Sequence, residues 1–156
     1  MTSVTPRDRR RLETGVKQAL RDTSLQLALL NHQVGARLKL RDADFDCLNL
    51  LSRHGPLGPG ALAKLAGLHP ATMTGVLDRL EKAGFVTRDR DPGDRRAVVV
   101  RTSPGRGREV LGLYAGMSDA MDEVCAGYSA EELAVILDFL QRAAAAGNDA
   151  TAGLAG

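Results

Sequence analysis

The sequence predicts a mainly α-helical fold with one small β-hairpin, and three observations carry this prediction. Apolar residues recur at steps of three and four over long stretches, which is the period of amphipathic helices. Only 3% of the residues are aromatic and none is Trp, so Leu, Val and Ala must fill the core, which favours packed helices. Two short strand-like segments instead flank Pro92 and Gly93.

Length and composition indicate one globular domain. The chain has 156 residues, of which 44% are hydrophobic and 26% are charged, so disorder is not expected. No stretch reaches the roughly 18 apolar residues that a membrane span needs. Cys47 and Cys125 lie far apart and match no metal-ligand spacing, which suits reduced thiols. A cytoplasmic protein without a membrane partner is therefore expected.

Pro and Gly residues mark the ends of several expected elements. Pro59 and Pro70 suit the first turn of a helix, whereas Gly67 and Gly84 suit the position that follows one. Residues 147–156 are small and polar enough for a loose tail. The expected elements are helices over about 9–40, from Asp42 or Asp44 to Gly55, over 59–67, over 70–83, from Ser103 and from a capping box at Ser129, with strands at 85–90 and 96–102.

Charge is divided unevenly along the chain. Basic residues outnumber acidic ones by 9 to 6 over residues 1–52 and by 11 to 5 over residues 53–108. Over residues 109–156 the ratio reverses to 1 to 8. The basic middle suits a polyanionic partner, because phosphate contacts need Lys and Arg. A solvated surface with uneven charge would give the same count.

A helix-turn-helix is expected over residues 59–83. Only Gly67-Leu68-His69-Pro70 connects its two helices, so they must cross at a steep angle. Apolar residues share one face of the second helix, which leaves small residues and hydroxyls facing outward near its start. Such a surface can approach a DNA major groove, with Thr72 and Thr74 as donors and Arg79 as a phosphate contact. An ordinary surface helix is the alternative.

A charged hairpin follows this helix. Pro92 and Gly93 stand at the second and third positions of its turn, which are the residues that a type II turn requires. The arginines and aspartates around the turn are costly to hold together unless the arginines have a partner. A DNA minor groove is such a partner, because its narrow width concentrates negative potential on an inserted guanidinium. The expected DNA-contacting arginines are Arg88, Arg90, Arg95 and Arg96. A solvated charged turn is the alternative.

Two segments together resemble the MarR family of bacterial transcriptional regulators. The segment VLDRLEKAGFV at residues 76–86 is similar to the end of the family's recognition helix. The segment DPGDRR at residues 91–96 is similar to the family's Asp-x-Arg wing. The resemblance extends from the long first helix to the sixth.

This resemblance implies a winged helix-turn-helix at residues 42–102 and a helical dimerisation region at residues 1–41 and 103–146. It implies a homodimer in which each winged domain reads half of a pseudo-palindromic operator in double-stranded DNA. It further implies that Asp94 orients a wing arginine and that Arg96 enters the minor groove.

The sequence departs from the family at three points. After the wing, the usual Leu-Thr and a following Gly are replaced by Thr102-Ser103-Pro104-Gly105-Arg106, so a looser or shifted hinge into the fifth helix is expected. The family often has Arg, Lys or another polar residue where Gly75 stands, so base readout here is expected to be weaker or to depend more on DNA shape. Members that sense oxidants typically carry a cysteine near the start of the first helix, and this chain has none there. Cys47 and Cys125 lie on mainly apolar helix faces and are expected to be buried structural thiols.

An effector pocket is a further implication of the resemblance. Family members bind small, often aromatic or phenolic anions in the crevice between the dimerisation helices and the DNA-binding domain. The polar residues that could line it here are Asn31, His32, Arg37 and Asp46. His32 could equally be a satisfied surface or interface histidine, and that interpretation is favoured.

The expected function is that of a homodimeric transcriptional regulator, a repressor relieved by a small-molecule effector. The alternative is a winged-helix module for protein–protein interaction without sequence-specific DNA binding, against which the wing arginines speak. No enzyme, catalytic residue, metal or cofactor is expected. The sequence shows no catalytic constellation, and its histidines His32, His54 and His69 are isolated.

Overall fold

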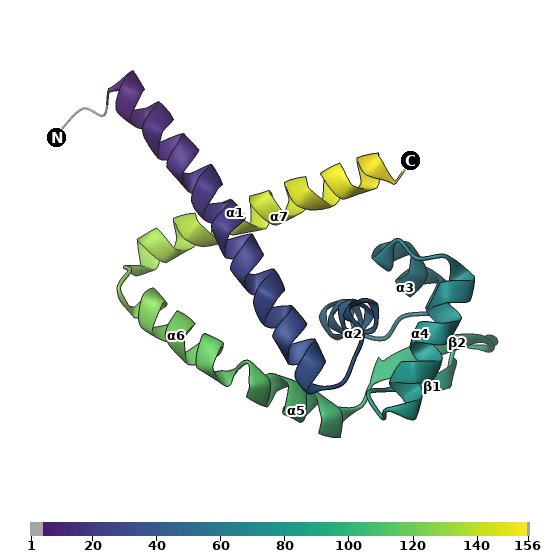
Figure 1. Cartoon of the computed structure of the whole chain (residues 1–156). Helices are drawn as coiled ribbons and strands as arrows, with labels where there is room; N and C mark the ends of the chain where they lie inside the picture. The colour runs from purple at the N-terminus through teal and green to yellow at the C-terminus, as the bar shows by residue number, and fades with distance from the viewer. Residues whose placement is uncertain (1–4, 156) are drawn as a thin grey trace. The chain divides into compact units, whose positions relative to one another are not determined.

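The computed structural model describes residues 5–155, and Figure 1 shows the course of the chain. The predicted class, mainly α-helical with one antiparallel hairpin, is confirmed. The elements are α1 (Pro6–Arg37), α2 (Asp42–His54), α3 (Pro59–Ala66), α4 (Pro70–Lys82), β1 (Val86–Asp91), β2 (Asp94–Thr102), α5 (Pro104–Leu113), α6 (Ala115–Ala126) and α7 (Ala130–Leu154). The chain divides into two compact units, one up to Phe45 and one from Asp46 onward.

Helix α1 dominates the first unit and begins three residues earlier than expected. The Thr5 hydroxyl accepts a hydrogen bond from the Asp8 amide at 3.2 Å, and the Asp8 carboxylate accepts one from the Thr5 amide at 3.3 Å. This reciprocal capping box satisfies amide groups that the first turn of a helix leaves unpaired. The helix ends at Arg37 because the backbone turns left-handed at Lys39, where φ is 58°.

The helix-turn-helix of the second unit closely matches the prediction. Gly67 and Gly84 both adopt the left-handed backbone that ends a helix, with φ of 64° and 80°. Pro70 opens α4 as expected. The apolar face of α4 is buried, as predicted from its spacing. The core of this region consists of Cys47, Leu48, Leu51, Leu62, Ala63, Met73, Val76, Leu77, Leu80, Phe85, Val86 and Val100.

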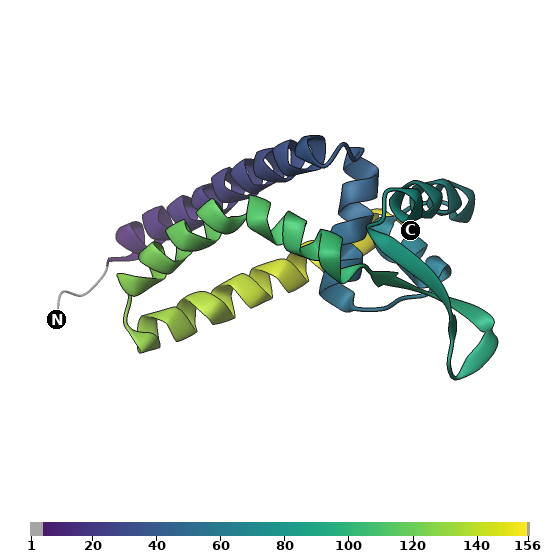
Figure 2. The ribbon, with the colours of Figure 1, turned by 90° about the horizontal axis from the view of Figure 1, so that it is seen from below.

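The β-hairpin extends as a long ribbon beyond α3 and α4 (Figure 2). Its base is anchored by buried Val86 and Val100, and Val100 also forms a bridge with Leu57. The predicted type II turn is wrong, because Gly93 lacks the positive φ that such a turn requires. Instead the Asp91 carboxylate accepts a hydrogen bond from the Gly93 amide at 2.9 Å, so a side chain holds the turn.

The last third of the chain differs from the expected pair of helices. The predicted fifth helix is interrupted at Tyr114, whose amide bonds to the Leu111 carbonyl in a tighter turn, so α5 and α6 are separate. The capping box at Ser129 is confirmed. A loose tail was expected from residue 147, but helix α7 continues to Leu154. The alanines at 143–146 have high helix propensity and favour this continuation.

The two cysteines lie in different surroundings. Cys47 is buried, as predicted. Cys125 is exposed, which corrects the expectation of a second buried thiol. The reason is that helix α6 carries no buried residue at all in the described chain. Among residues 5–155 no helix is long and apolar enough to cross a membrane.

Candidate nucleic-acid interface

The outward surface of α4 presents the predicted threonines. Thr72 and Thr74 are both exposed and flank the face that lies opposite the buried apolar one. The Thr74 hydroxyl, however, donates to the Pro70 carbonyl at 3.1 Å within the helix. The sequence predicted a donor to DNA at this position. In the structure Thr74 offers only an acceptor oxygen outward unless its hydroxyl rotates.

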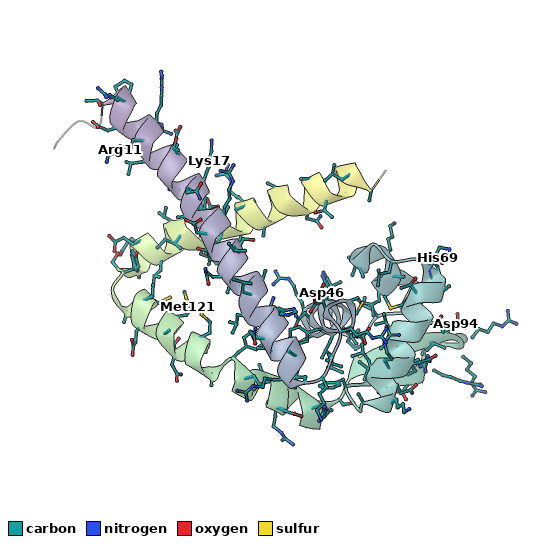
Figure 3. All side chains as sticks on the ribbon, viewed as in Figure 1. Arg11, Lys17, Asp46, His69, Asp94 and Met121 are labelled. Carbon is teal, nitrogen blue, oxygen red and sulfur yellow. The ribbon has the colours of Figure 1, made fainter. Side chains whose placement is uncertain are left out.

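His69 caps this helix, a role that the sequence analysis missed. Its Nδ1 accepts a hydrogen bond from the Ala71 amide at 3.2 Å, and its backbone is extended. Figure 3 marks His69 at the beginning of α4. Because Nδ1 accepts, the neutral ring carries its hydrogen on Nε2. A sequence signal did exist, since a Pro at the first helical position makes the preceding residue the cap.

Gly75 and Arg79 are coupled on the outward surface. A Cβ atom added at Gly75 would lie 3.4 Å from Nη1 of Arg79, so the guanidinium lies back along the helix toward the glycine. Arg79 is half-buried rather than extended into solvent. The absence of a side chain at Gly75 thus leaves a shallow surface beside a cation, near the middle of α4.

Two arginines at the hairpin tip, Arg95 and Arg96, lie in a bulge of β2. Arg90 pairs with Val98, but the next residue, Asp91, pairs with Asp94. Three residues of β2, Arg95, Arg96 and Ala97, therefore have no partner on β1. A bulge of this kind bends the strand and redirects its side chains. Both arginines are exposed, as is Arg90.

Asp94 holds the backbone of this bulge. Its Oδ1 accepts a hydrogen bond from the amide of Arg96 at 3.0 Å. The resemblance implied that Asp94 orients a wing arginine. In the structure the contact reaches the arginine's main chain, so the carboxylate fixes where the Arg96 side chain leaves the strand. Figure 3 marks Asp94 in the hairpin.

Arg88 is engaged within the protein, unlike the arginines at the tip. Its Nη2 lies 2.7 Å from Oδ1 of Asp78, and its Nε lies 2.9 Å from Oε2 of Glu81. Both carboxylates belong to α4. Hydrogen bonds to Glu81 and then Asp78 raise the pKa of Arg88. The structure therefore groups Arg88 with α4, although the sequence analysis placed it among the DNA-contacting residues.

The predicted effector residues do not line the cavity that the second unit contains. Asn31, His32 and Arg37 lie near the end of α1, and Asp46 lies in α2. The Nδ1 of His32 is 2.9 Å from the Asp42 carboxylate, in keeping with a histidine that is satisfied locally.

A cavity of about 220 Å³ lies instead between α2, the ends of the hairpin and α5. Its walls combine the apolar side chains of Phe85, Val110 and Leu111 with the cation of Arg108. The guanidinium of Arg106 lies 4.1 Å from the centre of the Phe85 ring. The cavity thus adjoins Phe85, which lies three residues beyond the end of α4 at Lys82. Within residues 5–155 no group of three or more His, Cys, Asp or Glu side chains is placed to hold a metal ion.

A short helix, a tight turn, a second helix and an arginine-tipped hairpin together define a winged helix-turn-helix DNA-binding protein. The family model for the MarR family matches residues 40–98. The chain is 33% identical to the transcriptional regulator YcgE of Bacillus subtilis over 140 residues, which cover 90% of this chain and 91% of that protein. This chain belongs to the MarR family of transcriptional regulators, a family whose members bind DNA and are generally not enzymes.

Two further similarities extend the comparison. The transcriptional repressor NicR of Pseudomonas putida is 37% identical over 62 residues, which cover 40% of this chain and 39% of NicR. The crystal structure of the transcriptional regulator Tm0710 from Thermotoga maritima superposes with a TM-score of 0.63 at 26% identity, over 89% of this chain and 98% of that one. The structural similarity to Tm0710 therefore extends over nearly the whole chain, beyond the winged region itself.

Proposed function

We propose that this regulator acts as a homodimeric repressor that binds a pseudo-palindromic operator and releases it when a small-molecule effector binds. The observation that carries the DNA-binding part is the bulged hairpin tip, where Asp94 fixes the backbone from which Arg96 projects. In this proposal the tip arginines enter the minor groove. The start of α4, with Thr72 and Thr74, enters the adjacent major groove.

The dimer is supported by apolar side chains without cover. Helices α5, α6 and α7 contain no buried residue among those described. Large apolar residues remain exposed along all three, including Leu111 and Val135 at 71% each. Soluble proteins rarely expose so much apolar surface unless it forms an interface. A two-fold dimer would also place two winged regions on successive half-sites of an operator.

Repression and its relief have separate support. The relative NicR is named a transcriptional repressor, which favours repression rather than activation of transcription here. The cavity beside Phe85 combines apolar walls with Arg108, a composition that suits a small aromatic anion. An effector there would contact both α5 and Phe85, three residues beyond the end of the recognition helix α4. Because its target is DNA, the proposed site of action is the cytoplasm.

Binding to the DNA that flanks its own gene tests the proposal. Fluorescence anisotropy should show one dimer per duplex, with two half-sites centred about 10 base pairs apart or a multiple of that distance. A protein-interaction module would instead bind that DNA no better than a scrambled duplex. Release of the operator by small aromatic carboxylates, lost in Arg108→Ala, tests the effector part.

Gly75→Ala should raise stability and lower DNA affinity at once. An alanine in a helix interior gains about 0.5–1 kcal/mol over glycine, and only the movable tip of Arg79 lies near the new methyl group. A methyl group pressed into a close interface should cost about 1–3 kcal/mol of operator binding. Gly147→Ala in α7, with nothing within 4 Å, is the control and should raise only the melting temperature. Unchanged operator affinity for Gly75→Ala would place this surface outside the groove.

A further inference from the structure

Arg88 stands apart from the other hairpin arginines because it bridges two secondary-structure elements. Asp78 and Glu81 are three residues apart on α4 and so share one face of that helix. The Arg88 guanidinium reaches both carboxylates from β1, with distances of 2.7 Å to Asp78 and 2.9 Å from Nε to Glu81. Only 29% of its side chain is exposed. A planar guanidinium held by two carboxylates has little freedom to reach another partner.

The electrostatics of this cluster oppose a phosphate contact. Arg88 contributes one positive charge, whereas Asp78 and Glu81 contribute two negative charges. The cluster therefore carries a net negative charge, which a DNA phosphate would be repelled by. Hydrogen bonds to Glu81 and Asp78 also raise the pKa of Arg88, so its guanidinium stays charged.

The position of Arg88 along the hairpin allows this cluster to control the orientation of the hairpin tip. Arg88 pairs with Val100, near the buried base of the hairpin, while Arg90 and the bulge lie farther toward the tip. Beyond Arg88, the described residues of the hairpin up to the turn and back to Val99 include none that is buried. The ion pairs at Arg88 are thus the outermost polar link from the hairpin to α4 that these contacts provide. A small rotation of the hairpin at Arg88 would displace its tip much farther than its base.

We propose that Arg88 is a positioning residue that fixes the angle between the wing and the recognition helix through Asp78 and Glu81, and that it makes no contact with DNA. The inference rests on the proposed docking, in which α4 and the wing enter neighbouring grooves at the same time. Two grooves can be reached together only if the angle between the two elements is held. The cluster supplies that constraint without using any of the tip arginines.

The salt dependence of operator binding separates positioning from contact. Loss of a phosphate contact lowers the slope of log affinity against log salt concentration by about one unit. Arg88→Ala should weaken operator binding roughly tenfold with an unchanged slope, because it removes a coupled ion-pair network and no contact. Arg90→Ala is the matched control on the same strand, and it should lower the slope. An Arg88→Ala slope that falls as much as that of Arg90→Ala, or an unchanged affinity, would overturn the proposal.

Two further variants keep the test decisive if Arg88→Ala folds poorly. Arg88→Lys keeps the charge but cannot bridge both carboxylates, so a positioning role predicts weaker binding and a phosphate contact predicts nearly normal binding. The double variant Arg88→Glu with Glu81→Arg keeps the composition of the cluster and should restore most of the affinity that Arg88→Glu alone loses. A folded double variant with no recovery contradicts the inference. Failure of the unmodified protein to bind operator DNA would instead contradict the proposed function.

Discussion

Replacing Leu137 and Leu140 of α7 with aspartate should convert the protein into a monomer and lower operator affinity by about 100-fold or more. Both side chains are about half exposed in the single chain, at 57% and 50%, so the substitutions disturb no packed core. In a dimer, each apolar Å² that is buried contributes about 25 cal/mol, and a buried carboxylate opposes association strongly. Two linked winged regions bind far more tightly than one, because the second binding event becomes intramolecular.

Light scattering should report the mass of the variant, and anisotropy its operator affinity. The double variant Gln141→Asp with Asn148→Asp adds the same two charges to α7 without removing apolar surface, so it controls for repulsion between an acidic helix and DNA. It should remain dimeric and lose little affinity. A Leu137→Asp, Leu140→Asp variant that still has the mass of a dimer would show that this part of α7 is not the interface.

The winged region could be predicted from the sequence because its boundaries are set by single residues with narrow backbone preferences. Helices α3 and α4 begin at Pro59 and Pro70, and the left-handed residues after their ends are Gly67 and Gly84. Proline fixes φ at the start of a helix, and glycine tolerates the left-handed conformation after its end. These are local properties of single residues, so the helix boundaries can be predicted without knowledge of the fold.

The errors arose where neighbouring groups compete for the backbone. A Pro-Gly pair alone favours a type II turn. Here, however, the Asp91 side chain accepts a hydrogen bond from the Gly93 amide, and this bond selects another turn conformation. The start of α1 depends on the reciprocal bonds between Thr5 and Asp8, which lie before the first apolar repeat. The periodic apolar pattern continues through Tyr114, so nothing in the period reveals the break between α5 and α6.

The site was only partly predictable for a related reason. Which arginines gather near the wing follows from the sequence, but which of them are already paired does not. Arg88 lies seven residues from Glu81 and ten from Asp78, beyond the reach of helical spacing rules. The glycine turn at Gly84 folds β1 back along α4 and brings the three together. Only the tertiary structure separates this arginine from Arg95 and Arg96.

Arg96→Ala should reduce operator affinity by about 1–3 kcal/mol and weaken the preference for narrow A·T flanks. Arg96 is exposed on the bulge of β2, where no strand partner restrains its side chain. A guanidinium inserted in the minor groove gains most where the groove is narrow, so its removal should affect A·T-rich flanks more than G·C-rich ones. Anisotropy on matched duplexes that differ only in their flanks measures this difference. Equal losses on both duplexes would place Arg96 on the phosphate backbone instead.

Asp94 offers two substitutions that separate its charge from its hydrogen bond. Its Oδ1 accepts the Arg96 amide at 3.0 Å, and this bond fixes the bulge from which Arg96 projects. Asp94→Asn keeps an acceptor oxygen and removes a negative charge beside DNA, so it should bind the operator at least as tightly as the unmodified protein. Asp94→Ala removes the charge and the acceptor together, and it should bind less tightly despite the lost repulsion. If Asp94 acted only through its charge, both variants would bind more tightly by the same factor at each salt concentration.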